Sequence, residues 1–195
     1  MSSRNDILAS IKSNKPELLS IPTIDLEVFE DSRALVDEFV LKVETAGGQV
    51  VKVDSKDKVM NHVGTLFPEA KVKYSALDYT GQFNTVDFET LTNPKDLEDL
   101  DVLVLESDLG VAENGAVWVK DNLLPMRVLP FITKHLVLVV HQEHLMPFMH
   151  QAYQKLNVED TDFGVFISGP SKTADIEQSL VIGAHGALSL SVFLV

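Results

Sequence analysis

The amino-acid sequence predicts an α/β protein: a single three-layer domain whose helices cover an open, mostly parallel β-sheet. Short stretches rich in Val, Leu and Ile recur along the 195 residues, and segments with helical periodicity separate them. No linker, repeat or low-complexity segment interrupts this alternation. We therefore expect one domain over residues 1–195, with residues 1–20 as an N-terminal helical extension.

Two amphipathic helices are predicted in the first quarter of the chain. Residues 5–13 place Ile7, Leu8 and Ile11 at helical spacing, after Asn5 or Asp6 as the N-cap. Residues 32–44 carry a second apolar face, formed by Leu35, Val36, Phe39, Val40 and Val43. The Gly47–Gly48 pair is expected to end this helix, and a β-branched strand over residues 49–53 follows.

Further strands are predicted from β-branched and apolar stretches. Residues 101–105 and 135–140 are almost continuously apolar, which is typical of strands buried on both faces of a parallel sheet. The Asn114–Gly115 pair predicts a tight turn that makes either a hairpin or a strand entry. The other expected elements are a short helix at 94–100 and strands at 71–76, 163–167 and 187–195.

Composition excludes several classes of function. The formal net charge of -13 disfavours binding to nucleic acid or to anionic membranes. The absence of cysteine excludes disulfides, thiolate metal ligands and an iron–sulfur cluster held by this chain. No signal peptide or spanning apolar segment is recognised, so we expect a cytoplasmic protein without membrane insertion.

The segment that follows the strand at 163–167 is the strongest candidate for a binding site. Gly169 and Pro170 are expected to turn the chain into a helix that begins near residues 171–174. Free amides at the head of such a helix, together with Ser171, Lys172 and Thr173, would suit a carboxylate or a phosphate. The expected apolar face of this helix consists of Ile176, Leu180 and Val181.

A purely structural interpretation of this segment stays open. Ser171 or Thr173 would then cap the helix, while Asp175 and Glu177 complement its dipole. Asp175 also argues against a highly charged anion, so a monoanion or a single carboxylate fits better. The segment matches neither the P-loop nor the dinucleotide-binding pattern.

Two further residues are candidates for acid–base chemistry. His185 lies between Gly183 and Gly186, and a histidine in a loop can serve as an acid, a base or a hydrogen-bond donor, although a structural hydrogen bond to a carbonyl group would also explain it. Glu113 lies on the predicted Asn-Gly turn, where shielding from water would suit a general acid or a nucleophile. A solvated Glu113 on an exposed turn is the competing interpretation.

A group of histidines follows the predicted strand at 135–140. His141, His144 and His150 do not have the spacing of a zinc-protease motif, and Pro147 interrupts the helix that would align them. We therefore predict no metal site in this chain.

The sequence resembles the LUD family, formerly called DUF162, along nearly its whole length. The resemblance rests on the Gly-Pro-Ser-Lys-Thr-Ala-Asp-Ile-Glu run at 169–177, the Gly-Ala-His-Gly loop at 183–186 and the Ala-Glu-Asn-Gly-Ala segment at 112–116. It extends to the N-terminal segment 4–8 and to the Leu-Pro pair ahead of the strand at His135. Asn114 stands where members commonly have Thr, and Lys172 replaces the usual Arg.

The resemblance implies a fold and a function. The fold would be NagB/RpiA/CoA-transferase-like, and the chain would act in the oxidation of L-lactate to pyruvate beside iron–sulfur partner subunits. The cofactors would then sit on the partners and not on this chain. The small anion would bind at Gly169, Ser171, Lys172 and Thr173, with Glu113 and His185 as the acid–base groups.

Other classes of function remain open. Glu113–Asn114–Gly115 is similar to the segment around the nucleophilic glutamate of class I CoA-transferases, although Ala112 replaces the serine of that segment and the chain is short for such an enzyme. A non-catalytic assembly or anion-sensing subunit is the third possibility. The sequence does not decide whether the isolated chain is an enzyme.

Overall fold

The computed structural model describes residues 3–20, 22–25, 29, 34–78, 82–91, 93–156, 162–174 and 180–195. The chain divides into two compact units, residues 1–30 and 31–195. In the first unit, α1 (Ser3–Ser13) confirms the predicted N-terminal helix. Its apolar residues are exposed, with Ile7 58% and Ile11 56% accessible. Among the described residues, no helix combines the length and the apolar character needed to cross a bilayer.

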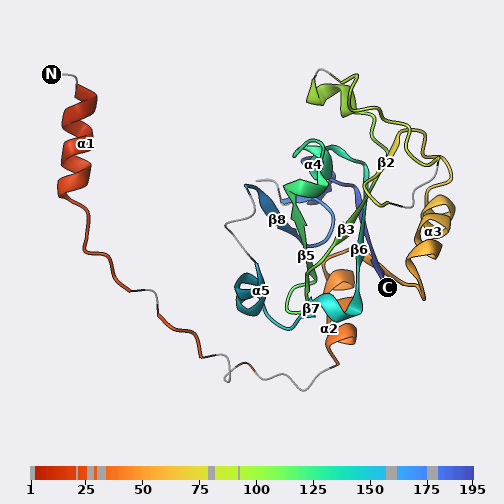
Figure 1. The fold of residues 1–195 in the computed structure, drawn as a ribbon, viewed down its shortest axis with the longest axis horizontal. Coiled ribbons are helices and arrows are strands. Elements are labelled where there is room, and N and C mark those ends of the chain that lie inside the picture. The colour runs from red at the N-terminus through yellow and green to blue at the C-terminus, as the bar shows by residue number, and fades with distance from the viewer. Residues whose placement is uncertain are drawn as a thin grey trace. The chain divides into compact units, whose positions relative to one another are not determined.

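The second unit is built around a five-stranded parallel sheet, as the sequence predicts (Figure 1). The strand order is β1-β11-β6-β3-β2. The three inner strands are the apolar ones, because both of their faces are covered. The bounds are β1 (Gln49–Lys52), β2 (Lys73–Ser75), β3 (Val102–Ser107), β6 (His135–Val140) and β11 (Ser189–Leu194).

Helices and core residues divide between the two faces of this sheet. On one face, Phe39 and Val43 of α2 (Leu35–Thr45) pack with alternate residues of β3 such as Leu103. On the other, α3 (Val59–Leu66) packs with the intervening residues, such as Val104. Two 3₁₀ turns complete this part, η2 (Lys56–Lys58) and η3 (Pro94–Leu97), the latter at the predicted short helix. The predicted layers of helix and sheet are thereby confirmed.

A second, smaller sheet extends the layer on the α2 side. It has the order β7-β4-β5-β8 and contains the predicted hairpin, in which the Asn114–Gly115 turn joins β4 to β5. The strand predicted at 163–167 is β8, which pairs antiparallel with β5 and not with the parallel sheet. The strands are β4 (Gly110–Val111), β5 (Ala116–Lys120), β7 (Leu145–Met146) and β8 (Gly164–Ile167). The short helical elements around them are η4 (Asp121–Leu123), α4 (Leu129–Ile132), η5 (Gln142–His144) and α5 (Met149–Lys155).

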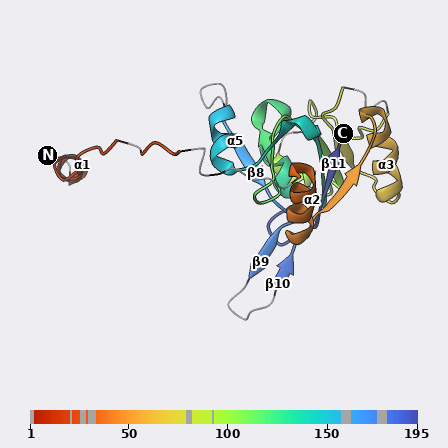
Figure 2. The same ribbon diagram turned by 90° about the horizontal axis from the view of Figure 1, so that it is seen from below.

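The helix predicted after Pro170 is wrong. The chain instead forms β9 (Lys172–Ala174), which pairs antiparallel with β10 (Leu180–Ile182). Figure 2 shows the two strands extending away from the sheets. The spacing of a few apolar residues does not distinguish a short helix from a short strand, and Thr173 and Val181 are β-branched. The predicted positions Asp175, Ile176 and Glu177 lie outside the described residues.

Candidate functional site

A cavity of about 410 Å³ lies at the amino ends of the central strands β6 and β11. We call it the amino-end cavity. Leu136, near the start of β6, and Ala187, just ahead of β11, line it from the parallel sheet. The rest of its lining comes from α4, from β8 and from the loops on either side of the β9–β10 hairpin, namely Pro130, Phe131, residues 165–173, His185 and Gly186.

The structure brings most of the sequence-predicted site residues together in this cavity. Gly169, Ser171, Lys172, Thr173 and His185 all line it. The hairpin accounts for this arrangement, because it folds the loop around His185 back toward Ser171. The amide of Gly183 donates to the carbonyl oxygen of Ser171 over 3.0 Å.

The backbone of this cavity differs from the one that the sequence analysis expected. The amide of Ser171 donates to the carbonyl oxygen of Ala187 over 2.9 Å, and residues 172–174 take part in the β9–β10 ladder. The expectation of free amides at a helix N-terminus is therefore wrong. Polar side chains are what these residues offer to a ligand.

The side chain of Lys172 is held by a residue outside the β9–β10 hairpin. Its Nζ donates to the carbonyl oxygen of Ala46 over 2.5 Å. Ala46 is the C-cap of α2, so the ammonium group complements the negative end of that helix. The backbone of Gly169 also lies close to Ala46, because a Cβ atom added to Gly169 would be 2.4 Å from the carbonyl oxygen of Ala46.

The charge of the amino-end cavity is unusual for this acidic chain. Lys172 and His185 line it with two hydroxyl residues, Ser171 and Thr173. No described residue of its lining is a carboxylate, although the chain carries 29 Asp and Glu against 16 Lys and Arg. The cavity thus offers donors and positive charge, which are the groups that recognise a small anion.

Glu113 lies in a different cavity, of about 410 Å³, beside α2. Its Oε2 accepts a hydrogen bond from the amide of Met149 over 2.8 Å, at the start of α5. Glu38 and Lys42 line the same cavity, with their charged groups 3.4 Å apart. Glu113 is exposed, which agrees with the interpretation of a solvated residue on an exposed turn. Glu113 and His185 do not line a common cavity in the described structure.

The three clustered histidines have different contacts. The Nε2 of His141 lies 3.6 Å from Oε1 of Glu106, and its ring centroid is 5.4 Å from that of His144. The ring of His150 stacks on Phe148. Within the described ranges, no three His, Asp or Glu side chains are placed to hold a metal ion.

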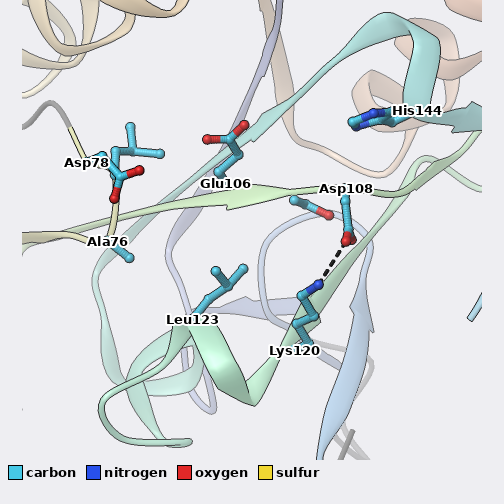
Figure 3. Close-up of a pocket in the computed structure, with 9 residues that line it drawn as sticks. Ala76, Asp78, Glu106, Asp108, Lys120, Leu123 and His144 are labelled. Carbon is cyan, nitrogen blue, oxygen red and sulfur yellow. Dashed lines mark hydrogen bonds and ion pairs between the residues drawn. The ribbon is translucent and has the colours of Figure 1, made fainter. Parts of the chain in front are cut away.

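Sequence reasoning missed a third cavity, of about 230 Å³, at the carboxyl ends of β2 and β3 (Figure 3). We call it the carboxyl-end cavity. Its polar lining consists of Asp78, Glu106, Ser107, Asp108, Lys120 and His144, and its apolar lining of Ala76, Leu77 and Leu123. A signal was present, because Glu106 and Asp108 come directly after the buried strand predicted at 101–105, and ligands in open α/β sheets bind at strand carboxyl ends.

Together these features define an α/β protein with a parallel sheet, a smaller mainly antiparallel sheet and polar cavities at both ends of the central strands. The model of the LUD domain family matches residues 36–195. The chain therefore belongs to the LUD domain family, as its resemblance indicates.

Proteins named lactate utilization protein C are similar to this chain. The protein from Oceanobacillus iheyensis is 30% identical over 104 residues, which are 50% of this chain and 45% of the relative. The protein from Bacillus pumilus is 34% identical over 98 residues, which are 47% of this chain and 41% of the relative. These matches span less than half of the relatives' own length. A match to the protein from Geobacillus sp. (strain WCH70) is longer, with 24% identity over 99% of this chain and 79% of the relative.

A solved structure also resembles the chain. It belongs to a DUF162 family protein from Deinococcus radiodurans, with a TM-score of 0.64 and 13% sequence identity. The match covers 82% of this chain and 95% of the other. At this identity, the similarity concerns the fold alone.

Proposed function

We propose that this chain acts in lactate utilisation, as a component of L-lactate oxidation to pyruvate beside iron–sulfur partner subunits, and that it binds a small carboxylate in the amino-end cavity. The pathway is supported by membership of the LUD domain family and by the names of the curated relatives. One observation supports the ligand: the cavity combines Lys172, His185 and two hydroxyls with no carboxylate among its described lining residues.

The chemistry of these groups fits a carboxylate of lactate size. An ammonium group has three donors, and the bond from Lys172 to Ala46 occupies one of them, which leaves two for a ligand. The hydroxyl groups of Ser171 and Thr173 add neutral donors, and His185 donates from either ring nitrogen when it is protonated. The cavity of about 410 Å³ is large for lactate alone, so a larger acid or bound water would fill the remainder.

The chain's lack of cysteine supports the assignment of redox chemistry to partners. Cysteine thiolates hold most iron–sulfur clusters, and this chain has none. A subunit that binds the organic acid would then present it to a cluster-bearing protein. Affinity purification of the tagged chain from a lactate-grown source should recover a cysteine-rich iron–sulfur protein.

Calorimetry on purified variants tests the ligand site. L-Lactate and pyruvate should bind the wild-type chain, and Lys172→Ala should weaken binding roughly tenfold through loss of a charge-assisted hydrogen bond. Ser171→Ala should weaken it less. The exposed Lys95, which lies in η3 and does not line this cavity, provides the matched control Lys95→Ala.

The outcomes separate the possibilities. Equal affinity in wild type and Lys172→Ala would exclude the proposed anion site. Recovery of the iron–sulfur partner without affinity for any small acid would favour a non-catalytic assembly subunit.

A CoA-transferase-like reaction at Glu113 is the second candidate, because Glu113 lines a cavity and the Met149 amide orients its carboxylate. The carboxylate would attack the thioester carbonyl of an acyl-CoA, forming a mixed anhydride and releasing CoA thiolate. The thiolate would then attack the glutamyl carbonyl, releasing the free acid and leaving a glutamyl-CoA thioester. Hydroxylamine converts such a thioester to a hydroxamate, which mass spectrometry detects at Glu113. Absence of this adduct after incubation with acetyl-CoA would exclude the reaction for that donor.

A further inference from the structure

We propose that the carboxyl-end cavity binds a small uncharged polyol, at a site separate from the anion site proposed above. Its volume of about 230 Å³ corresponds to about eight water molecules at roughly 30 Å³ each, so it has room for a compact ligand of four or five carbons. It lies at the carboxyl ends of parallel strands, where open α/β sheets bind their ligands. The amino-end cavity lies at the opposite ends of the central strands.

Two of the three carboxylates of the cavity are held in place by lysines from other elements. Asp108, at the end of β3, pairs with Lys120 of β5 at 2.8 Å (Figure 3). Glu106 of β3 pairs with Lys56 of η2. These ion pairs fix the positions of the charged groups before a ligand arrives. Both carboxylates and Lys120 line the cavity, whereas Lys56 does not, so the Asp108–Lys120 pair presents acceptors and a donor side by side.

His144 adds a polar atom that has no partner. Its Nδ1 is buried and makes no hydrogen bond to any residue in the described part of the chain. The side chain lines the cavity across from Asp78 and Glu106 (Figure 3). This nitrogen is closed to water in the structure, so the ring must turn before a ligand in the cavity can bond to it.

The mixture of charges selects the ligand class. A hydroxyl group both donates and accepts, so a polyol can bond to a carboxylate and to an ammonium group at once. An organic anion would meet the carboxylates of Asp78, Glu106 and Asp108. A cation would find two of those carboxylates already paired with lysines, and it would meet the ammonium group of Lys120 in the cavity. The apolar wall of Ala76, Leu77 and Leu123 suits the C–H face of a sugar or polyol.

Asp78 is the residue to change, because it is exposed and forms no ion pair with the described residues. Asp78→Asn therefore removes an acceptor from the cavity without breaking either lysine pair. Glu69, which is exposed and lies outside the cavity, provides the matched control Glu69→Gln.

The test is an NMR titration of the full chain with three probes of similar size: erythritol, its carboxylate analogue erythronate and its amine analogue 4-amino-1,2,3-butanetriol. Erythritol should shift the ring signals of His144 and the amides of Leu77, Asp108 and Leu123. Asp78→Asn should weaken this binding roughly tenfold, and Glu69→Gln should leave it unchanged.

Other results would overturn the proposal. The first is an absence of shifts at the cavity residues up to 50 mM erythritol, which is about the weakest affinity of interest for a ligand of this size. The second is tighter binding of erythronate or of the amine at these residues. The third is equal affinity for erythritol in wild type and Asp78→Asn. None of them bears on the proposed anion site, because Lys172 and His185 line the other cavity.

Discussion

The ammonium group of Lys172 donates a hydrogen bond to the carbonyl oxygen of Ala46 over 2.5 Å, although the two residues are 126 positions apart in the sequence. This bond joins the β9–β10 hairpin to the C-terminal end of α2. A cation near a helix C-terminus is stabilising, and the carbonyl groups of the last turn lack partners within the helix.

Replacing Lys172 by Met should therefore lower stability as well as anion affinity. We expect the free energy of unfolding to fall by about 0.5–1 kcal/mol, because Met retains the apolar stem and loses the charge. Lys172→Arg should recover most of the loss, since guanidinium also donates to carbonyl oxygens. Denaturant unfolding measures the difference, and equal stability of Lys172→Met and wild type would show that the bond contributes little.

Gly169 should tolerate no side chain. Its φ is +73°, and an added Cβ would lie 2.4 Å from the Ala46 oxygen. Gly169→Ala should therefore cost about 2 kcal/mol or more, from the left-handed backbone and the clash. The control is Gly64→Ala in α3, where no atom lies within 4 Å of the added Cβ. That substitution should stabilise the chain by about 0.5–1 kcal/mol. This explanation would be contradicted if the free energy of unfolding of Gly169→Ala were as high as that of Gly64→Ala.

The central sheet could be predicted from the sequence because its inner strands are buried on both faces. Continuous apolar stretches such as 135–140 are then required, whereas partly exposed strands would alternate. The β4–β5 hairpin was also predictable, because the Asn114–Gly115 turn is a local signal and Gly115 adopts a φ of +67°.

Pairing between distant segments could not be predicted in the same way. The partner of β8 is β5, and nothing local in residues 164–167 specifies that choice. The wrong helix after Pro170 has a related cause, since the few apolar residues there fit a strand as well as a helix. One cavity is still lined by all of the predicted anion-site residues and by His185, because the β9–β10 hairpin brings the segment around His185 back to Ser171. The anion-site residues are Gly169, Ser171, Lys172 and Thr173. The carboxyl-end cavity was missed because it combines residues from the segment after β2 with residues from β3, β5, η4 and η5.

Asp101 should make stability depend on pH in the acidic range. Burial raises the pKa of its carboxyl group, but hydrogen bonds from Lys134, Val72 and Lys71 outweigh burial and hold the pKa at about 2. As the pH falls, Asp101 is therefore protonated at a higher pH in the unfolded chain than in the folded chain. The stabilisation is complete above about pH 4 and is lost as the pH falls through about 2.

The variant Asp101→Asn tests this dependence. At pH 7 it should be less stable than wild type by about 1 kcal/mol, a value reduced for the solvent that reaches the pair. The difference should shrink as the pH falls from 4 toward 2, as measured by urea unfolding at each pH. Glu69→Gln serves as the control for a change of net charge, and a difference that is constant with pH would contradict the expectation.

His135 should titrate below the ordinary histidine value of about 6.5. Burial lowers the pKa of its ring, and the negative charge of Asp101 opposes that effect in part. The ring stacks on Phe67 with centroids 4.6 Å apart, and its Nδ1 lies 2.8 Å from Oγ of Ser189. Because the neutral ring is favoured in the folded state, its contribution to stability is complete above about pH 6.5 and is lost as the pH falls toward the folded pKa.

An NMR titration of the His135 ring in two variants separates these causes. In wild type the midpoint should lie below 6.5. In Asp101→Asn it should fall further, because the carboxylate charge that favours the protonated ring is gone. In Phe67→Ala it should rise toward 6.5, because water reaches the ring. A midpoint that rises in Asp101→Asn would contradict a direct effect of the Asp101 charge on His135. It would indicate instead that the structure has rearranged where β3 and β6 begin.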